Sequence, residues 1–321
     1  MPAVAFRIAS ALLLAIAASS SLAQGWPSKP IRWVVPFPPG GSNDIATRMV
    51  TERLTRMLGQ AVVVENRPGA AGTMGTEYVA KSTSDGYTVL SGSDGMTSAP
   101  HLYPKLGFDP LKDFAPVAQL SRQPVLLAAH PSLGASSVAE LVVLVRMKPG
   151  LAYASSGAGS PQHITAEWFA SLAGIKLTHV PYKGGGQAIT DFIGGQVQLA
   201  SLGPGPLIPH YRAGKLKLLA QASSARSPGL PEVPTYEEAG IKGLVLEQWF
   251  GVFVPAGTSK EIIGRLNAGT VQSLADPKIR ERYAQSGLEP VGGTPERFAA
   301  VVRADYDKYG RLVRELKIKI D

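Results

Sequence analysis

The feature of this sequence that most constrains its fold is a glycine-rich junction that occurs three times between a strand-like run and a helix-like run. The three junctions contain Gly40-Gly41, Gly157 to Gly159 and Gly184 to Gly186. A strand followed by a tight glycine turn and a helix is the repeating unit of an open α/β sheet. Because a long stretch of chain separates the first junction from the other two, we expect two such sheets, one in each of two lobes.

The elements of the first lobe are predicted from the order of apolar runs and turn residues. We expect a strand over residues 31–35, a turn over 36–43, and a helix that begins at Asp44 and ends at Gly59. The elements expected next are a strand, a helix and a strand, over residues 62–65, 76–81 and 87–90.

The same order of elements returns in the second half of the chain. We expect a strand over residues 151–154, a turn over 155–161 and a helix over 164–172. This second lobe is completed by a strand over residues 178–181, a helix that runs through Phe192 and a strand over residues 197–201.

From Trp249 onward the pattern becomes mainly helical. Asp276-Pro277 and Thr294-Pro295 are pairs that commonly begin a helix, with an N-cap residue followed by proline. We expect these helices to return to the first lobe. The predicted organisation is therefore a signal peptide over residues 1–23, a first lobe over 26–125 and 247–321, and a second lobe over 126–246.

The N-terminus has the features of a cleaved secretory signal peptide. Arg7 precedes an apolar run over residues 8–18, and small residues end at Ala23 with the spacing of a cleavage site. A membrane anchor would need about 20 apolar residues, which is more than this run supplies. The chain has no cysteine, so it can form neither a disulfide nor a lipid-modified cysteine anchor. We therefore expect a free periplasmic protein.

The charged residues give no indication of a nucleic-acid partner. The formal net charge is +8, from 32 basic and 24 acidic residues, and no five Lys or Arg residues occur in a row. Proteins that bind nucleic acids concentrate such residues in patches. A modest positive field would instead draw small anions toward the protein.

The glycine-rich junctions predict where such an anion would bind. In open α/β sheets, ligands bind beyond the carboxyl ends of the strands, where glycine lets the backbone approach the ligand. Unpaired N–H groups at the starts of the helices attract anions there. One glycine loop can also serve only to make a tight turn. Three loops divided between two lobes favour an anion site in a cleft.

Motifs of catalysis are missing from the sequence. It contains no G-x-S-x-G, S-x-x-K, H-E-x-x-H or Walker A motif and no complete G-x-G-x-x-G motif, so a secreted hydrolase is disfavoured. The histidines do not have the spacing of metal ligands, and only His163, at a helix start after a glycine junction, is placed to reach the cleft. We expect a binding protein with no catalytic residue, cofactor or metal.

Ordered motifs along nearly the whole chain resemble one family of binding proteins. They include Val34-Val35-Pro36-Phe37-Pro38-Pro39-Gly40-Gly41, Val64-Glu65-Asn66-Arg67-Pro68-Gly69, Asp85-Gly86-Tyr87-Thr88, His179-Val180-Pro181-Tyr182-Lys183-Gly184 and Pro290-Val291-Gly292-Gly293-Thr294-Pro295. These motifs are similar to those of the Bug family, the extracytoplasmic receptors of tripartite tricarboxylate transporters.

The resemblance implies a two-lobed α/β fold of the Venus-flytrap type, type II-like, that holds a small organic carboxylate between its lobes. It also implies a monomer that delivers its ligand to the membrane subunits of a tripartite tricarboxylate transporter. A sensor of the same fold that feeds a signalling partner is the alternative. The positions that match the family's site are Phe37, Gly40, Gly41, Ser42, Asn43, Ser155, Ser156, Gly157, Gly159, His163, Tyr182 and Lys183.

Two segments depart from the family pattern. Where many relatives carry acidic residues near residues 197–203, this chain has Gln198 and no acid. Space beside Gly203 would suit a longer or flatter ligand, so we expect dicarboxylic or aromatic acids to bind ahead of aspartate and glutamate. Asp94 either contacts the ligand or caps a helix, and the cap is the favoured interpretation.

Overall fold

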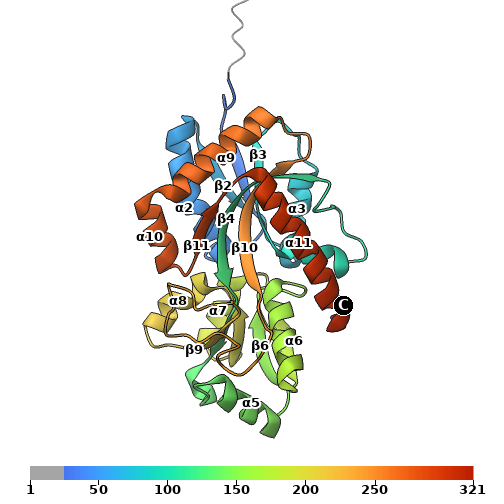
Figure 1. The fold of residues 1–321 in the computed structure, drawn as a ribbon, viewed down its shortest axis with the longest axis vertical. Helices are drawn as coiled ribbons and strands as arrows, with labels where there is room; N and C mark the ends of the chain where they lie inside the picture. Colours follow the sequence, from blue (N-terminus) through green and yellow to red (C-terminus); the bar gives the residue numbers. More distant parts are fainter. Residues whose placement is uncertain (1–24, 321) are drawn as a thin grey trace, which may run out of the picture.

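The computed structural model describes residues 25–320, which form two α/β lobes (Figure 1). Each lobe is built on one mixed sheet, of six strands in the first lobe and five in the second. The predicted two-lobed α/β fold is therefore confirmed. The expected signal peptide over residues 1–23 lies outside the described residues. Among the helices within residues 25–320, none combines the length and apolar character that crossing a bilayer requires.

The first lobe, called lobe 1 below, contains the sheet β11-β4-β10-β3-β1-β2 and the helices packed on it. β1 is parallel to β2 and β3, whereas β10 is antiparallel to β3 and β4. Its strands are β1 (Ile31–Val35), β2 (Val62–Asn66), β3 (Thr88–Ser93), β4 (Phe114–Pro124), β10 (Glu247–Pro255) and β11 (Glu289–Gly292). Its helices are α2 (Ser42–Leu58), η1 (Ala70–Gly72), α3 (Thr73–Ala80), α4 (Gly95–Ser98), η2 (Ala99–His101), α9 (Lys260–Ala275), α10 (Pro277–Gln285) and α11 (Pro295–Glu315).

The second lobe, called lobe 2 below, contains the sheet β7-β6-β8-β5-β9. Here β6 is parallel to β7 and β8, and β5 is antiparallel to β8 and β9. Its strands are β5 (Leu126–Ala129), β6 (Leu151–Ser155), β7 (Leu177–Pro181), β8 (Leu199–Leu202) and β9 (Lys217–Gln221). Its helices are η3 (Pro131–Leu133), α5 (Val138–Met147), α6 (Pro161–Ala173), α7 (Gly185–Ile193) and α8 (Pro204–Arg212).

Two neighbouring strands join the lobes. β4 and β10 run side by side from lobe 1 toward lobe 2 (Figure 1), and their pairing extends from Phe114↔Pro255 to Pro124↔Glu247. β4 leads directly into β5 of lobe 2, and β10 brings the chain back. The polypeptide therefore crosses between the lobes along one antiparallel ribbon, which fixes where the facing surfaces of the lobes meet.

The C-terminal helices cover lobe 1, as the sequence predicts. α9 packs against α2 and β4, and α11 packs against β4 and α4. The two predicted N-caps are confirmed, because Asp276 accepts hydrogen bonds from the first N–H groups of α10 and Thr294 accepts one from Arg297 in α11. These caps satisfy N–H groups that the first turn of a helix leaves unpaired.

Three predicted helix starts are placed too late in the sequence. α2 begins at Ser42 rather than at Asp44, α3 at Thr73 rather than at residue 76, and α6 at Pro161 rather than at residue 164. Ser160 is the N-cap of α6 and Pro161 its first residue, the same combination as at α10 and α11. Asp44 lies inside the first turn of α2, where its negative charge is favourable to the helix dipole.

The close contact of α11 with β10 depends on a glycine. The Phe298 ring of α11 is buried against Trp249 and Phe253, with ring centroids 5.1 and 5.0 Å away. A Cβ on Gly251 in β10 would lie 2.0 Å from the Phe298 Cζ atom. The α11 helix can therefore approach the sheet this closely only because residue 251 has no side chain.

We expect Gly251→Ala to lower the free energy of unfolding by about 1–3 kcal/mol, because the added methyl overpacks the core at Phe298. Gly264→Ala is the matched control, since a Cβ at Gly264 in α9 meets nothing within 4 Å. That change should instead stabilise the protein by up to about 1 kcal/mol. Urea unfolding of both variants checks the prediction, and equal effects would contradict it.

Candidate ligand-binding site

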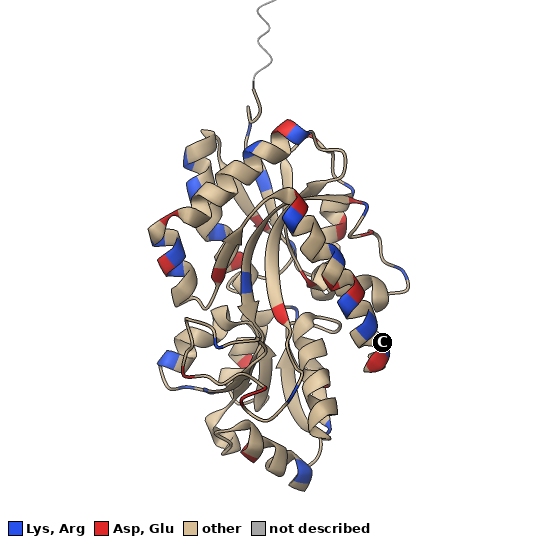
Figure 2. Cartoon of the chain, in the orientation of Figure 1, with Lys and Arg blue, Asp and Glu red and all other residues tan. Residues whose placement is uncertain are grey.

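A cavity of about 40 Å³ lies between the two lobes, at the ends of several strands. Both lobes and the returning strand β10 contribute to its wall. The residues that line it are Phe37, Gly41, Ser42, Asn43, Ala71, Ser156, Ser160, Pro161, Gln162, Gly185, Leu202, Gly203, Pro206, Gln248 and Phe250. No charged side chain is among these lining residues, although charges of both signs are dispersed over the outer helices (Figure 2).

Three helices begin at this cavity without a capping side chain. Their N-cap residues are Gly41 for α2, Gly184 for α7 and Gly203 for α8, and none of these helices has a side-chain cap hydrogen bond. The first N–H groups of a helix have no partner within it, and the helix dipole adds partial positive charge there. In α8, Pro204 and Pro206 have no N–H and the Gly205 N–H donates to Ser42 Oγ, so the free backbone donors are those of α2 in lobe 1 and α7 in lobe 2.

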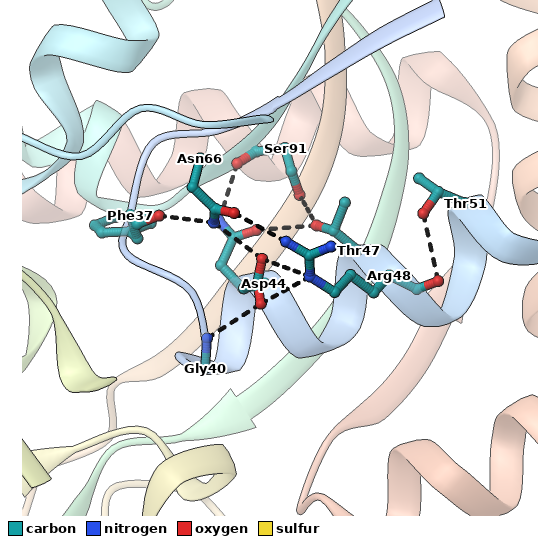
Figure 3. A network of polar contacts seen from close by, with 9 residues as sticks. Phe37, Gly40, Asp44, Thr47, Arg48, Thr51, Asn66 and Ser91 are labelled. Atoms are coloured by element: carbon teal, nitrogen blue, oxygen red, sulfur yellow. Dashed lines mark hydrogen bonds and ion pairs between the residues drawn. The ribbon is translucent and has the colours of Figure 1, made fainter. Parts of the chain in front are cut away.

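The loop before α2 is held in place by a polar network (Figure 3). The buried Asp44 carboxylate accepts hydrogen bonds from the Gly40 N–H at 3.1 Å, Arg48 Nε at 3.0 Å and Asn66 Nδ2 at 2.9 Å. Asn66 Nδ2 also donates to the Phe37 carbonyl at 2.9 Å. Because Arg48 balances the charge of Asp44, the network fixes the loop while leaving the cavity wall uncharged.

Asn43 belongs to a second part of the same network. Its Nδ2 donates to the Ser91 carbonyl of β3 at 2.9 Å, and its Oδ1 accepts from Thr47 Oγ1 at 3.2 Å. Thr47 Oγ1 also forms a hydrogen bond with Ser91 Oγ, 2.7 Å away (Figure 3). The sheet of lobe 1 thus fixes the start of α2 in a defined position.

Direct hydrogen bonds hold the lobes together around the cavity. Ser42 Oγ of lobe 1 accepts from the Gly205 N–H of lobe 2 at 3.1 Å. Ser98 Oγ donates to the Gly159 carbonyl and Tyr103 Oη to the Ala158 carbonyl, both at 3.0 Å. Each of these bonds joins the two lobes, so the structure is a closed arrangement.

Six of the fourteen residues predicted from the sequence line the cavity. They are Phe37, Gly41, Ser42, Asn43, Ser156 and Gly203. Gly40 does not line it, because its N–H turns toward Asp44 and its φ of 83° reverses the chain before α2. That left-handed conformation favours glycine, so Gly40 shapes the loop rather than the wall.

The junction after β6 contributes mostly to contacts outside the cavity wall. Ser155 Oγ lies 2.6 Å from His179 Nε2, and Gly157 packs so close to lobe 1 that its Cβ would lie 3.0 Å from the Ala71 Cβ. The Gly159 N–H donates to His163 Nδ1 at 3.0 Å. Ser155, Gly157 and Gly159 therefore shape the loop and its contact with lobe 1.

His163 faces away from the cavity. Its ring stacks on His179 at 3.9 Å between centroids, in a groove that the C-terminal residues 316–320 help to form. Burial lowers the pKa of His163 to about 4 and that of His179 to about 3. Both rings are therefore neutral at pH 7.

Tyr182 and Lys183 also lie outside the cavity wall. Tyr182 Oη donates to Asp191 Oδ2 at 2.9 Å, within lobe 2, and the Lys183 side chain is exposed. The next residues of this junction come closer, since Gly185 lines the cavity. A Cβ on Gly184 would lie 2.6 Å from Pro38 Cδ of lobe 1. The glycines of this junction thus permit the close approach of the two lobes.

Two expectations about departures from the family pattern are wrong in detail. Asp94 makes no side-chain cap hydrogen bond, because its fully buried carboxyl instead accepts one from Tyr309 Oη of α11. Burial raises the pKa of Asp94 to about 8. The space beside Gly203 is already filled, since a Cβ there would lie 2.7 Å from Gln123 Nε2 and 2.8 Å from Ser42 Oγ.

Part of the cavity wall was not predicted from the sequence. Ser160 and Pro161 have the same N-cap and proline pattern as the starts of α10 and α11, and this local pattern indicates a helix start there. Gln248 and Phe250 carry no local signal. They reach the cavity because β10 pairs with β3 and β4, strands that are distant in the sequence.

Comparison with solved structures shows close likeness over nearly the whole chain. The periplasmic binding protein BugD has a TM-score of 0.88 and 33% identity, covering 92% of this chain and 99% of BugD. R. palustris Rpa4515, solved with adipate, has a TM-score of 0.89 and 34% identity, with 92% and 99% covered. MatC from Rhodopseudomonas palustris, with bound malate, has a TM-score of 0.86 and 33% identity, with 90% and 100% covered.

The sequence comparisons agree with the structural ones. Protein BugT of Bordetella pertussis is 37% identical over 93% of this chain and 92% of its own length. The model of the tripartite tricarboxylate transporter family receptor matches residues 46–318. Family and fold are those of a receptor that binds a solute, not those of an enzyme. The chain therefore belongs to the family of tripartite tricarboxylate transporter receptors and is a solute-binding receptor.

Proposed function

We propose that this receptor binds a small organic dicarboxylate, or an aromatic acid, in the cavity between its lobes. In this proposal it works in the periplasm as a monomer and delivers the ligand to the membrane subunits of a tripartite tricarboxylate transporter. The observation that carries the proposal is the convergence of two uncapped helix starts, that of α2 from lobe 1 and that of α7 from lobe 2, on a wall that contains no charged side chain.

A carboxylate suits such a wall because neutral donors can replace the water that it loses on binding. Backbone N–H groups of α2 and α7 and the Ser42 hydroxyl are the donors available. Hydrogen bonds from fixed dipoles are strong in a site that excludes water. The relatives solved with adipate and malate support an acid with two carboxyl groups.

An amino-acid ligand is disfavoured by the same wall. Its ammonium would be buried without a carboxylate to pair with, which costs several kcal/mol. Asp94 does not supply the missing charge, because burial raises its pKa to about 8 and the carboxyl is mostly neutral at pH 7. Dicarboxylic and aromatic acids are therefore preferred to aspartate and glutamate.

Ligand entry requires the lobes to separate. A cavity of about 40 Å³ has room for a few water molecules but not for a dicarboxylic acid. The moving units in this proposal are residues 26–125 with 247–321, and residues 126–246, which turn about the β4–β10 ribbon. Gly157, Gly159 and Gly184 act in closure, and ligand contact falls to the residues on the cavity wall.

In a calorimetric titration series we expect succinate, adipate, terephthalate or benzoate to bind at least tenfold more tightly than aspartate or glutamate. The reason is that no charged group on the described wall can pair with an ammonium. A thermal-shift screen over sugars and cations serves as the control. Tightest binding by an amino acid, or a response to sugars alone, would contradict the proposal.

Closure should depend on hydrogen bonds that do not touch the ligand. Tyr103→Phe removes the bond to the Ala158 carbonyl of the other lobe, so we expect ligand affinity to fall by about fivefold. Tyr182→Phe removes a comparable bond that lies within lobe 2, to Asp191, and should leave the affinity unchanged. Isothermal titration of both variants makes the comparison, and a larger effect of Tyr182→Phe would instead place Tyr182 at the ligand.

A further inference from the structure

A carboxyl group is buried behind the cavity wall with only part of its bonding capacity used. Asp94 has no exposed surface, and Tyr309 Oη donates to its Oδ2. Its Oδ1 has no hydrogen-bond partner by distance and angle among residues 25–320. Leaving a buried polar atom unpaired is costly, so the position of this carboxyl calls for an explanation.

The part of the cavity wall next to Asp94 is Gln248. The Asp94 N–H donates to the carbonyl of Trp249, the residue after Gln248 in β10, at 3.3 Å. The NH2 group of Gln248 faces the Asp94 carboxyl and lowers its pKa, although burial outweighs this effect. Asp94 therefore lies against the back of the one residue of β10 that presents an amide to the cavity.

The orientation of the Gln248 carboxamide is fixed from both lobes. Its Oε1 accepts from Gln123 Nε2 of β4 at 2.7 Å and from Gln162 Nε2 of α6 at 3.0 Å. Gln162 Oε1 in turn accepts from Ser156 Oγ at 2.7 Å. An amide oxygen has two lone pairs, and both are used here. What Gln248 has left to offer is its NH2 group, which can only donate.

We propose that Gln248 selects the ligand's second polar group by donating one N–H to it, and that Asp94 is the positioning residue that holds the NH2 group of Gln248 from behind through its other N–H. The inference rests on the proposed function. It adds that one subsite of the cavity presents a hydrogen-bond donor to the ligand. A group at this subsite must be an acceptor, such as a second carboxylate. An ammonium would meet a donor there.

The protonation state of Asp94 should then affect the binding of diacids. The groups that face it are Tyr309, Asp305 and Lys308 from α11 and the Gln248 carboxamide from β10. Tyr309 stays protonated, because burial raises its pKa well above 10. The pKa of Asp94 is about 8, so its ionisation above pH 8 places a negative charge behind the subsite.

The first test compares acids that differ only in the second carboxylate: adipate with hexanoate, and terephthalate with benzoate. Within whichever of these two pairs the protein binds, Gln248→Met should lower the ratio of diacid to monoacid affinity at least tenfold, whereas loss of the bonds from Gln123 and Gln162 should weaken both acids alike. Gln119→Met is the matched control, since Gln119 is a buried glutamine of β4 that does not line the cavity. Its ratio should equal that of the wild type.

The second test needs no change at the wall, so it holds even if Gln248→Met folds poorly. Between pH 7 and 9 the wild-type affinity for the diacid should fall by about tenfold, as expected for a group with a pKa near 8 that must be protonated. The monoacid affinity should stay level. Asp94→Asn, which keeps an acceptor for Tyr309, should abolish the dependence, whereas a merely structural Asp94 would change only the melting temperature.

The outcomes separate this inference from the proposed function. If wild-type protein binds acids but neither Gln248→Met nor pH changes the ratio of diacid to monoacid affinity, the inference is overturned and the proposed function stands. If the wild type binds none of the four acids, the proposed function fails and the inference fails with it.

Discussion

The pairing of β4 with β10 is the interaction on which the rest of the structure depends. These strands form an antiparallel ladder from Phe114↔Pro255 to Pro124↔Glu247, with register shifts at Phe250/Gly251 and Val252/Phe253, and they are the path along which the chain enters and leaves lobe 2. The same ladder positions Gln248 and Phe250 at the cavity. A shift of one residue in its register would turn these side chains to the opposite face of the sheet. Lobe connection and cavity wall are therefore determined together.

Among residues 25–320, the charged groups near the site lie behind the residues that line the cavity, and none of them lies on the cavity wall itself. Asp44 is paired with Arg48 and bonded to the loop before α2, while Asp94 is held in its neutral form by burial. Formal charges on the wall would have to lose their hydration each time the lobes closed. Backbone N–H groups and amide side chains avoid that cost. They remain oriented by the helices and strands whether or not an acid is bound.

What the sequence predicts well is what neighbouring residues determine. The glycine junction at Gly41, the end of α2 at Gly59 and the N-caps Asp276 and Thr294 all follow from local chemistry. The four predicted loop residues that line the cavity in lobe 1 belong to the same local unit, because a strand and the helix after it place the turn between them.

The parts that the sequence does not predict depend on pairing between distant segments. Tyr309 is 215 residues away from Asp94, so no local pattern shows that this carboxyl bonds to α11 instead of capping a helix. Gly203 shows the same limit, since the side chains that fill the space beside it come from β4 and α2. A glycine in a sequence indicates that another part of the protein approaches the backbone closely at that residue, but it does not indicate which part.

The position of β10 in the chain has a consequence for how the protein is made. Lobe 2 is continuous, whereas the sheet of lobe 1 needs strands from both ends of the sequence. As the chain is synthesised, β1 to β3 must wait for β10 to fill its place between β3 and β4. The sheet of lobe 2 can thus form first, although Tyr309, Leu312 and Val313 of α11 join the core beneath it only later. Nascent chains that end before Gln248 lack the strand that completes the cavity wall.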